Sequence, residues 1–167
     1  RFDEGTARRA LAVAVGGATG GAYRVRLLSD VSGRVRTEVS EIVPDDRPVR
    51  VRLSVRPVSR ENRFLYHKTT ARSVYEEALA AAPGADDVLL WNEDGELTES
   101  CYANLVVDAG NGWVTPPVSS GLLAGTFREA LVESGRVRVE TISKEGLRSA
   151  RSVWLVNSVR GWRKAVL

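Results

Sequence analysis

The segment FLYHKTTARSVYEEA, residues 64–78, places a lysine between an apolar piece of chain and a helix. The helix is expected over Ser73–Ala82, because Ala, Leu and Glu favour a helix and Pro83-Gly84 ends it. Aromatic and hydroxylated neighbours would remove water from the amine of Lys68, which lowers the pKa of a lysine and makes it a nucleophile. The chain has only three lysines, the other basic residues being arginine, which stays protonated and cannot act in this way. A surface lysine at the end of a strand is the alternative interpretation.

Helices and hairpins alternate on both sides of this segment without a regular βαβ repeat. Downstream, the pattern predicts strands over 87–92, 96–98, 103–107, 113–115, 137–141 and 152–157, and helices over 126–134 and 144–150. Upstream, it predicts a helix over 6–15 and strands over 22–28, 34–39 and 47–55. Such a mixture is typical of an α+β fold. Residues 57–62 have the composition of a linker, so we place a domain boundary there, with one domain over 1–58 and a second over 59–167.

The composition is that of a soluble globular protein. Of 167 residues, 43% are hydrophobic and 27% charged, which excludes disordered and fibrous classes. No apolar run approaches the ~20 residues of a membrane helix and none resembles a signal peptide, so we expect a cytoplasmic protein. A lone cysteine, Cys101, excludes an internal disulfide and a cysteine-based zinc site. A lone histidine, His67, argues against a histidine metal site, and no metal is expected.

Three further segments have the residues for chemistry, and each also has an ordinary structural interpretation. Glu99, in GELTESCYANLVV, is a carboxylate at a strand end, where a solvated turn is the simple alternative. The loop from Gly121 to Arg128 enters a helix whose free N–H groups favour an anion such as phosphate. It is otherwise a plain helix start capped by Thr126. The strand that ends at Asn157-Ser158 either adds a hydroxyl to the same anion or simply leaves the sheet.

Taken together and in this order, the four segments resemble the class IV aminotransferases, the fold-type IV enzymes that use pyridoxal 5'-phosphate (PLP). In that family a lysine is followed by a Thr/Ser-Glu-small segment, an Ala/Glu-Asn-Leu strand, a Leu-x-Gly-x-x-Arg loop and a strand ending in a small hydroxyl residue. The matching segments here are Lys68, Thr98-Glu99-Ser100 with Ala103-Asn104-Leu105, Leu123–Arg128 and Asn157-Ser158. The match extends from about residue 64 to the C-terminus.

Within the family, HKTT at 67–70 and NSVRGW at 157–162 are most similar to 4-amino-4-deoxychorismate lyase. The similarity is greatest to lyase domains fused to the chorismate-aminating component of 4-aminobenzoate synthase, so that component is an expected fusion or association partner. The implied reaction converts 4-amino-4-deoxychorismate to 4-aminobenzoate and pyruvate, a step toward folate. The resemblance also implies a homodimer.

The resemblance further implies what each site residue does. Lys68 would hold PLP as a Schiff base and move protons, and Glu99 would pair with the pyridine nitrogen. Backbone N–H groups at the start of the helix, with two hydroxyls, would hold the phosphate, and a leucine would pack on the ring. The implied cofactor-binding set is Lys68, Glu99, Leu123, Gly125, Thr126, Phe127 and Ser158.

The chain departs from the family pattern in the phosphate loop and at its front. Ala124 stands where the family often has Pro, and Phe127 where many members have Thr, so Ser158 and the backbone must hold more of the phosphate. Family members have a longer N-terminal domain before the lysine. Because only 67 residues precede that lysine and the chain has no Met, we expect this domain to be incomplete. Within it, Arg24 and Arg26 share one strand face and are the candidates for binding a substrate carboxylate.

Two other functions stay open at this point. An aminotransferase for branched-chain or D-amino acids has the same lysine, glutamate and phosphate loop, so these residues cannot separate it from the lyase. A non-catalytic domain is the other alternative, because an arginine-rich stretch could contact nucleic acid. That stretch contains Arg47, Arg50, Arg52, Arg56, Arg60 and Arg63. No aromatic residue is interleaved with them, and arginines alternating with Val and Leu are typical of a strand with one solvated face. We therefore expect a small-molecule substrate, and neither nucleic acid nor a membrane as partner.

Overall fold

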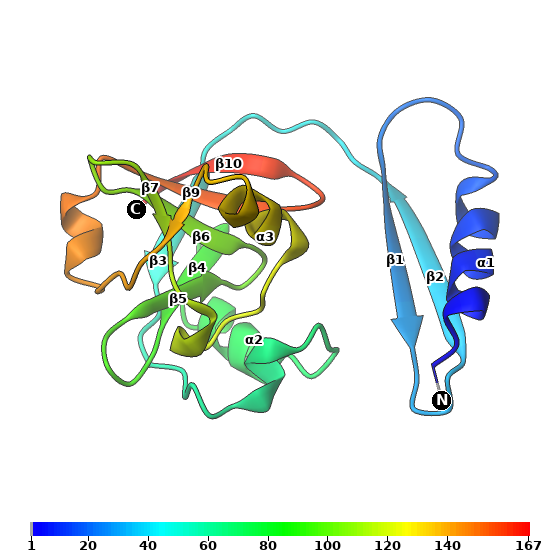
Figure 1. The fold of residues 1–167 in the computed structure, drawn as a ribbon, viewed down its shortest axis with the longest axis horizontal. Helices are drawn as coiled ribbons and strands as arrows, with labels where there is room; N and C mark the ends of the chain where they lie inside the picture. Colours follow the sequence, from blue (N-terminus) through cyan, green and yellow to red (C-terminus); the bar gives the residue numbers. More distant parts are fainter. Residues whose placement is uncertain (1) are drawn as a thin grey trace. The chain divides into compact units, whose positions relative to one another are not determined.

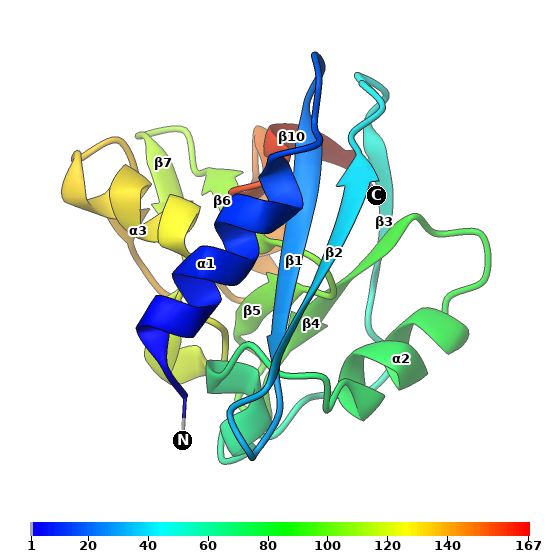
Figure 2. The ribbon, with the colours of Figure 1, turned by 90° about the vertical axis from the view of Figure 1, so that its right-hand side faces the viewer.

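The computed structural model describes residues 2–167, and the chain divides into two compact units, Arg1–Asp45 and Asp46–Leu167. In the smaller unit a helix, α1 (Glu4–Val15), packs against a hairpin of β1 (Tyr23–Ser29) and β2 (Val35–Glu41) (Figures 1 and 2). The carboxylate of Asp3 caps the helix by accepting from the backbone N–H of Thr6. The helix and hairpin expected here are confirmed. Arg1, which begins the expected domain over 1–58, lies outside the described residues.

The larger unit is built on an eight-stranded sheet that closes on itself. The strand order is β5-β4-β3-β10-β9-β6-β7-β8, and an additional pairing of β5 with β6 closes a ring. The ring consists of β3 (Val49–Leu53), β4 (Asp87–Trp91), β5 (Leu97–Ser100), β6 (Asn104–Asp108), β9 (Ser152–Asn157) and β10 (Gly161–Val166). Two short strands, β7 (Trp113–Thr115) and β8 (Arg138–Val139), extend the sheet beyond the ring.

Two helices flank the ring, α2 (Ser73–Ala80) and α3 (Thr126–Glu133) (Figure 1). Because side chains alternate along a strand, Leu89 and Leu105 join the core cluster that every ring strand contributes to. Their neighbours Val88 and Val106 join separate clusters with residues of α2 and α3. Burial on both faces explains why these strands are continuous apolar runs rather than alternating ones. Three short 3-10 helices complete the unit: η1 (Arg63–Tyr66), η2 (Val118–Ser120) and η3 (Gly146–Ser149).

The mixed α and β composition confirms the expected class, and most elements lie where the sequence predicts them. Three differ. The segment 144–150 forms only the 3-10 turn η3, and the strand predicted over 137–141 is reduced to β8. Strand β10 was not predicted, because its charged sequence lacks an apolar pattern. It forms because a tight turn returns the chain antiparallel to β9 and its far end pairs in parallel with β3.

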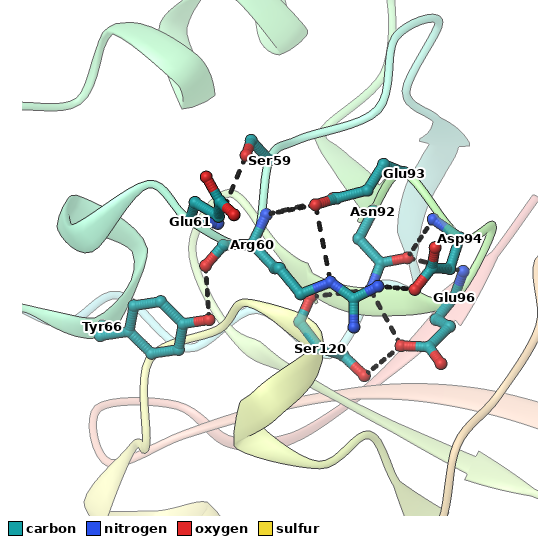
Figure 3. A network of polar contacts seen from close by, with 9 residues as sticks. All are labelled: Ser59, Arg60, Glu61, Tyr66, Asn92, Glu93, Asp94, Glu96 and Ser120. Carbon is teal, nitrogen blue, oxygen red and sulfur yellow. Dashed lines mark hydrogen bonds and ion pairs between the residues drawn. The ribbon is translucent and has the colours of Figure 1, made fainter.

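The segment 57–62, expected as a linker, is fastened to the larger unit. Val58 is buried, and its backbone N–H donates to a carbonyl at the end of β4, with a nitrogen–oxygen distance of 2.8 Å. The backbone and guanidinium of Arg60 bind the carboxylates of Glu93 and Asp94 (Figure 3). Strand β3, which precedes the segment, is hydrogen-bonded into the same sheet. The domain boundary between 58 and 59 stays a prediction about the domains of the protein.

None of the helices within residues 2–167 has the length and apolar content needed to cross a lipid bilayer.

Candidate active site

A continuous run of contacts connects α2 to α3 across the point where β5 pairs with β6. It begins at Tyr75 on α2, passes through Glu99 on β5 and Asn104 on β6, and reaches the loop before α3. At the start of α3 it continues to Ser158, just beyond the end of β9. The structure therefore brings three of the four predicted segments into one site, and the fourth, with Lys68, immediately precedes α2.

Glu99 is a buried carboxylate, with 5% of its surface exposed. The hydroxyl of Tyr75 donates to its Oε1 over 2.8 Å, and the Nδ2 of Asn104 donates to its Oε2 over 3.4 Å. Burial raises the pKa of Glu99 to about 7, although Tyr75, the backbone of Leu123 and the charge of Lys68 all act to lower it. Within the described part of the chain no cation forms an ion pair with it. The alternative interpretation of Glu99 as part of a solvated turn is thereby excluded.

Asn104 links the carboxylate to the loop before α3. Its Nδ2 donates to the carbonyl of Leu123 over 2.8 Å, while its Oδ1 lies where a Cβ on Gly125 would be. Only glycine fits that position without displacing the amide. Asn104 belongs to the Ala103-Asn104-Leu105 motif, but its local sequence predicts no role for it.

The start of α3 presents free donors. The backbone N–H groups of Thr126 and Phe127 have no acceptor within residues 2–167, as expected for the first turn of a helix. The hydroxyls of Thr126 and Ser158 are hydrogen-bonded to each other over 2.7 Å, so both converge at the start of α3. The alternative in which Thr126 caps the helix is wrong, because Gly125 occupies the cap position and no side chain caps it. The ring of Phe127 packs against the core cluster beneath α3.

Lys68 lies in the extended segment between η1 and α2, and its side chain is exposed. The burial of its amine by aromatic neighbours, predicted from the sequence, does not occur in this chain. The side chain is nevertheless near enough to Glu99 for its charge to lower the pKa of that carboxyl. An accessible amine beside a buried carboxylate is an arrangement that can hold a carbonyl compound covalently.

Arg24 and Arg26 lie on β1 of the smaller unit, both exposed. Arg26 is paired with Glu38 across the hairpin, at 3.2 Å between Nη1 and Oε2. Their role toward a substrate carboxylate stays a prediction.

Two residues missed by sequence reasoning complete the site. Tyr75, in the first turn of α2, donates to Glu99, and the guanidinium of Arg72 lies 4.5 Å from the centre of the Tyr75 ring. The Nη2 of Arg72 also donates to the carbonyl of Cys101 over 2.6 Å. The available signal was the position of Tyr75 in the helix that follows the candidate lysine.

These features fit PLP. A buried carboxylate without its own cation suits a protonated pyridine nitrogen. Unpaired N–H groups and converging hydroxyls at a helix start suit a phosphate. By contrast, no group of three or more His, Cys, Asp or Glu side chains within residues 2–167 is placed to hold a metal ion.

Comparison with known proteins gives matches along the whole chain. The family model for amino-transferase class IV matches residues 7–166. A protein of Schizosaccharomyces pombe named "Putative aminodeoxychorismate lyase" is 35% identical over 153 residues, which cover 80% of this chain and 66% of that protein.

Solved structures agree with this match. A crystal structure named "Putative amino-acid aminotransferase" from Mesorhizobium loti has a TM-score of 0.94 at 32% identity, over 100% of this chain and 83% of that one. A 4-amino-4-deoxychorismate lyase structure from Legionella pneumophila, also named as putative, has a TM-score of 0.72 at 27% identity, over 78% of this chain and 52% of that one.

The chain thus spans 66% of the S. pombe protein and 52% of the Legionella one. The family match covers nearly every residue, and the fold is shared. The chain belongs to the class IV aminotransferases, PLP-dependent enzymes of fold type IV.

Proposed function

We propose that the protein is a PLP-dependent lyase that converts 4-amino-4-deoxychorismate to 4-aminobenzoate and pyruvate. The observation that carries PLP chemistry is the buried carboxylate of Glu99, with 5% of its surface exposed and a pKa of about 7. The choice of the lyase is supported by the 35% identity to the S. pombe protein and by the HKTT and NSVRGW motifs.

In this proposal each side chain has a defined task. When bound, PLP supplies an electron sink next to the substrate carbon that bears the amino group. Glu99 accepts a hydrogen bond from the pyridine nitrogen and keeps it protonated. The N–H groups of Thr126 and Phe127 and the hydroxyl of Ser158 hold the phosphate, and Leu123 packs on the ring. The amine of Lys68 removes the ring proton of the substrate and returns a proton as the enol-pyruvyl group leaves, which produces an aromatic ring.

A class IV aminotransferase is the second candidate. The observation that favours it is the TM-score of 0.94 to the Mesorhizobium structure, which is named as an amino-acid aminotransferase. It would use Lys68, Glu99 and the phosphate loop in the same way, with branched-chain or D-amino acids as substrates.

One comparison of reactions separates the two candidates. The purified protein with added PLP is given 4-amino-4-deoxychorismate in one reaction, and amino acid plus 2-oxo acid in another. Formation of equal amounts of 4-aminobenzoate and pyruvate supports the lyase, and release of pyruvate without 4-aminobenzoate overturns it. A Lys68→Ala variant should lack both activities. Failure of the protein to gain a visible absorbance band with PLP contradicts both candidates.

We also propose that the protein is a cytoplasmic homodimer that acts in the folate pathway. Its substrate would come from the chorismate-aminating component of 4-aminobenzoate synthase, as a fused or associated partner. Light scattering of the purified protein tests whether it is a homodimer. Co-purification with the aminating component tests whether the two proteins associate. A monomer at all concentrations would contradict the homodimer.

A further inference from the structure

The buried carboxylate of Glu99 depends on one short side-chain hydrogen bond. Among the described residues two side chains donate to it, and they differ in strength. The hydroxyl of Tyr75 is 2.8 Å from Oε1, whereas the Nδ2 of Asn104 is 3.4 Å from Oε2 and is 2.8 Å from the carbonyl of Leu123. The amide of Asn104 is therefore committed mainly to the loop, and Tyr75 is the principal side-chain donor to Glu99.

Tyr75 is itself held in place from several sides. With 7% of its surface exposed, it belongs to the core cluster between α2 and β4. The guanidinium of Arg72 lies 4.5 Å from the centre of its ring and is anchored by the bond to the carbonyl of Cys101. Burial and the neighbouring Glu99 raise the pKa of Tyr75, so its hydroxyl keeps its proton and remains a donor. The phenol is thus fixed before any ligand arrives.

We propose that Tyr75 is a positioning residue that fixes the orientation of Glu99 and holds it as a carboxylate toward the pyridine nitrogen of PLP. The proposal rests on the role given to Glu99 above. A hydrogen bond to a charged acceptor favours the charged form, and a buried carboxylate that lacks it becomes a neutral acid. A neutral, rotatable Glu99 would pair less well with a protonated ring nitrogen.

Tyr75 lowers the pKa of Glu99 more than any other group does, and the backbone of Leu123 and the charges of Lys68 and Arg72 add smaller contributions. Lys68 and Arg72 act on it through space and lower its pKa, but neither forms an ion pair with it in the described chain. The thiol of Cys101 has a pKa raised to about 12 by burial, so it is neutral near pH 7. Asp87, which accepts from the backbone N–H of Cys101, is a second buried acid with a raised pKa, so only a signal assigned to the Glu99 carboxyl reports on Glu99.

The test is a carbon-13 NMR titration of the full chain, labelled at the glutamate carboxyls and free of PLP. The Glu99 signal is assigned by its loss in Glu99→Gln. In Tyr75→Phe, which keeps the ring and the packing, its midpoint should rise by about one pH unit. The matched control is Tyr66→Phe, which removes a hydroxyl that donates to the carbonyl of Arg60 over 2.7 Å (Figure 3). The control should leave the midpoint unchanged.

The second measurement is the affinity for PLP near pH 7, followed by its absorbance. Tyr75→Phe should bind PLP about ten times more weakly than the parent protein, and Tyr66→Phe equally well. An unchanged Glu99 midpoint in Tyr75→Phe overturns the proposal. A raised midpoint with unaltered affinity also overturns it, because Tyr75 would then not act on the cofactor. If the Glu99 midpoint rises in Tyr75→Phe but neither protein binds PLP, the action of Tyr75 on Glu99 is supported and the proposed function is refuted.

Discussion

Glu99 should make the stability of the PLP-free protein depend on pH. Its pKa is about 7 in the folded chain against an ordinary value of 4.5. Between these values the folded state keeps a proton that the unfolded state has lost, so stability falls as pH rises, by about 3 kcal/mol in all. Urea unfolding at pH 5 and pH 8 measures this. In Glu99→Gln the stability should fall less between pH 5 and pH 8, because the contribution of Glu99 is absent. Asp87, another buried acid with a raised pKa, contributes equally to both proteins.

Gly125 is a position at which the structure favours glycine over any other residue. In Gly125→Ala the new methyl group would overlap the Oδ1 of Asn104. The amide of Asn104 would have to move, which breaks its hydrogen bond to the carbonyl of Leu123. We expect a loss of about 1–3 kcal/mol in the free energy of unfolding and weaker PLP binding. The matched control is Gly17→Ala, because no atom lies within 4 Å of the added carbon. Equal stability of the two variants would show that the Asn104 amide moves at no cost.

The sequence predicted the candidate cofactor-binding residues better than the residues that hold them in place. Glu99 and Ser158 stand in short motifs, so local pattern was enough to single them out. Tyr75 reaches Glu99, 24 residues further along the chain, from a helix that packs on β4, and Asn104 reaches Leu123 across 19 residues. Such pairings depend on tertiary structure, and no local spacing contains them.

Among the elements, the start of α3 should bind the phosphate and no other part of PLP. Ser158→Ala removes one of its two converging hydroxyls and should weaken PLP binding about tenfold. Pyridoxal, which lacks the phosphate, should bind both proteins with the same affinity. The control is Ser149→Ala on η3, which removes an exposed hydroxyl that donates to the carbonyl of Gly146. An equal loss for pyridoxal would place Ser158 against the ring instead.

The elements also show where sequence patterns stop being informative. Strands β4, β6 and β9 are apolar on both faces and were predicted within a residue or two. Strand β10, which reads GWRKAV, carries two cations and has only Ala165 fully buried. Its strand conformation comes from backbone pairing with β9 and β3 rather than from its own side chains. A pattern of side chains cannot predict a strand that forms for this reason.

For the whole molecule, the topology predicts which backbone amides exchange slowest with solvent. Strands β6 and β9 pair with each other, have further strands on their outer sides, and are covered on both faces by core clusters. The hairpin of β1 and β2 forms a two-stranded sheet whose side chains are mostly exposed. Exchange by local opening is slow where pairing and burial coincide and fast where a strand has one partner and little core. In deuterium exchange followed by mass spectrometry, the peptides of β6 and β9 should therefore remain protected longest and those of the hairpin should exchange first. Protection of the hairpin equal to that of β6 would mean that contacts beyond its own unit stabilise it.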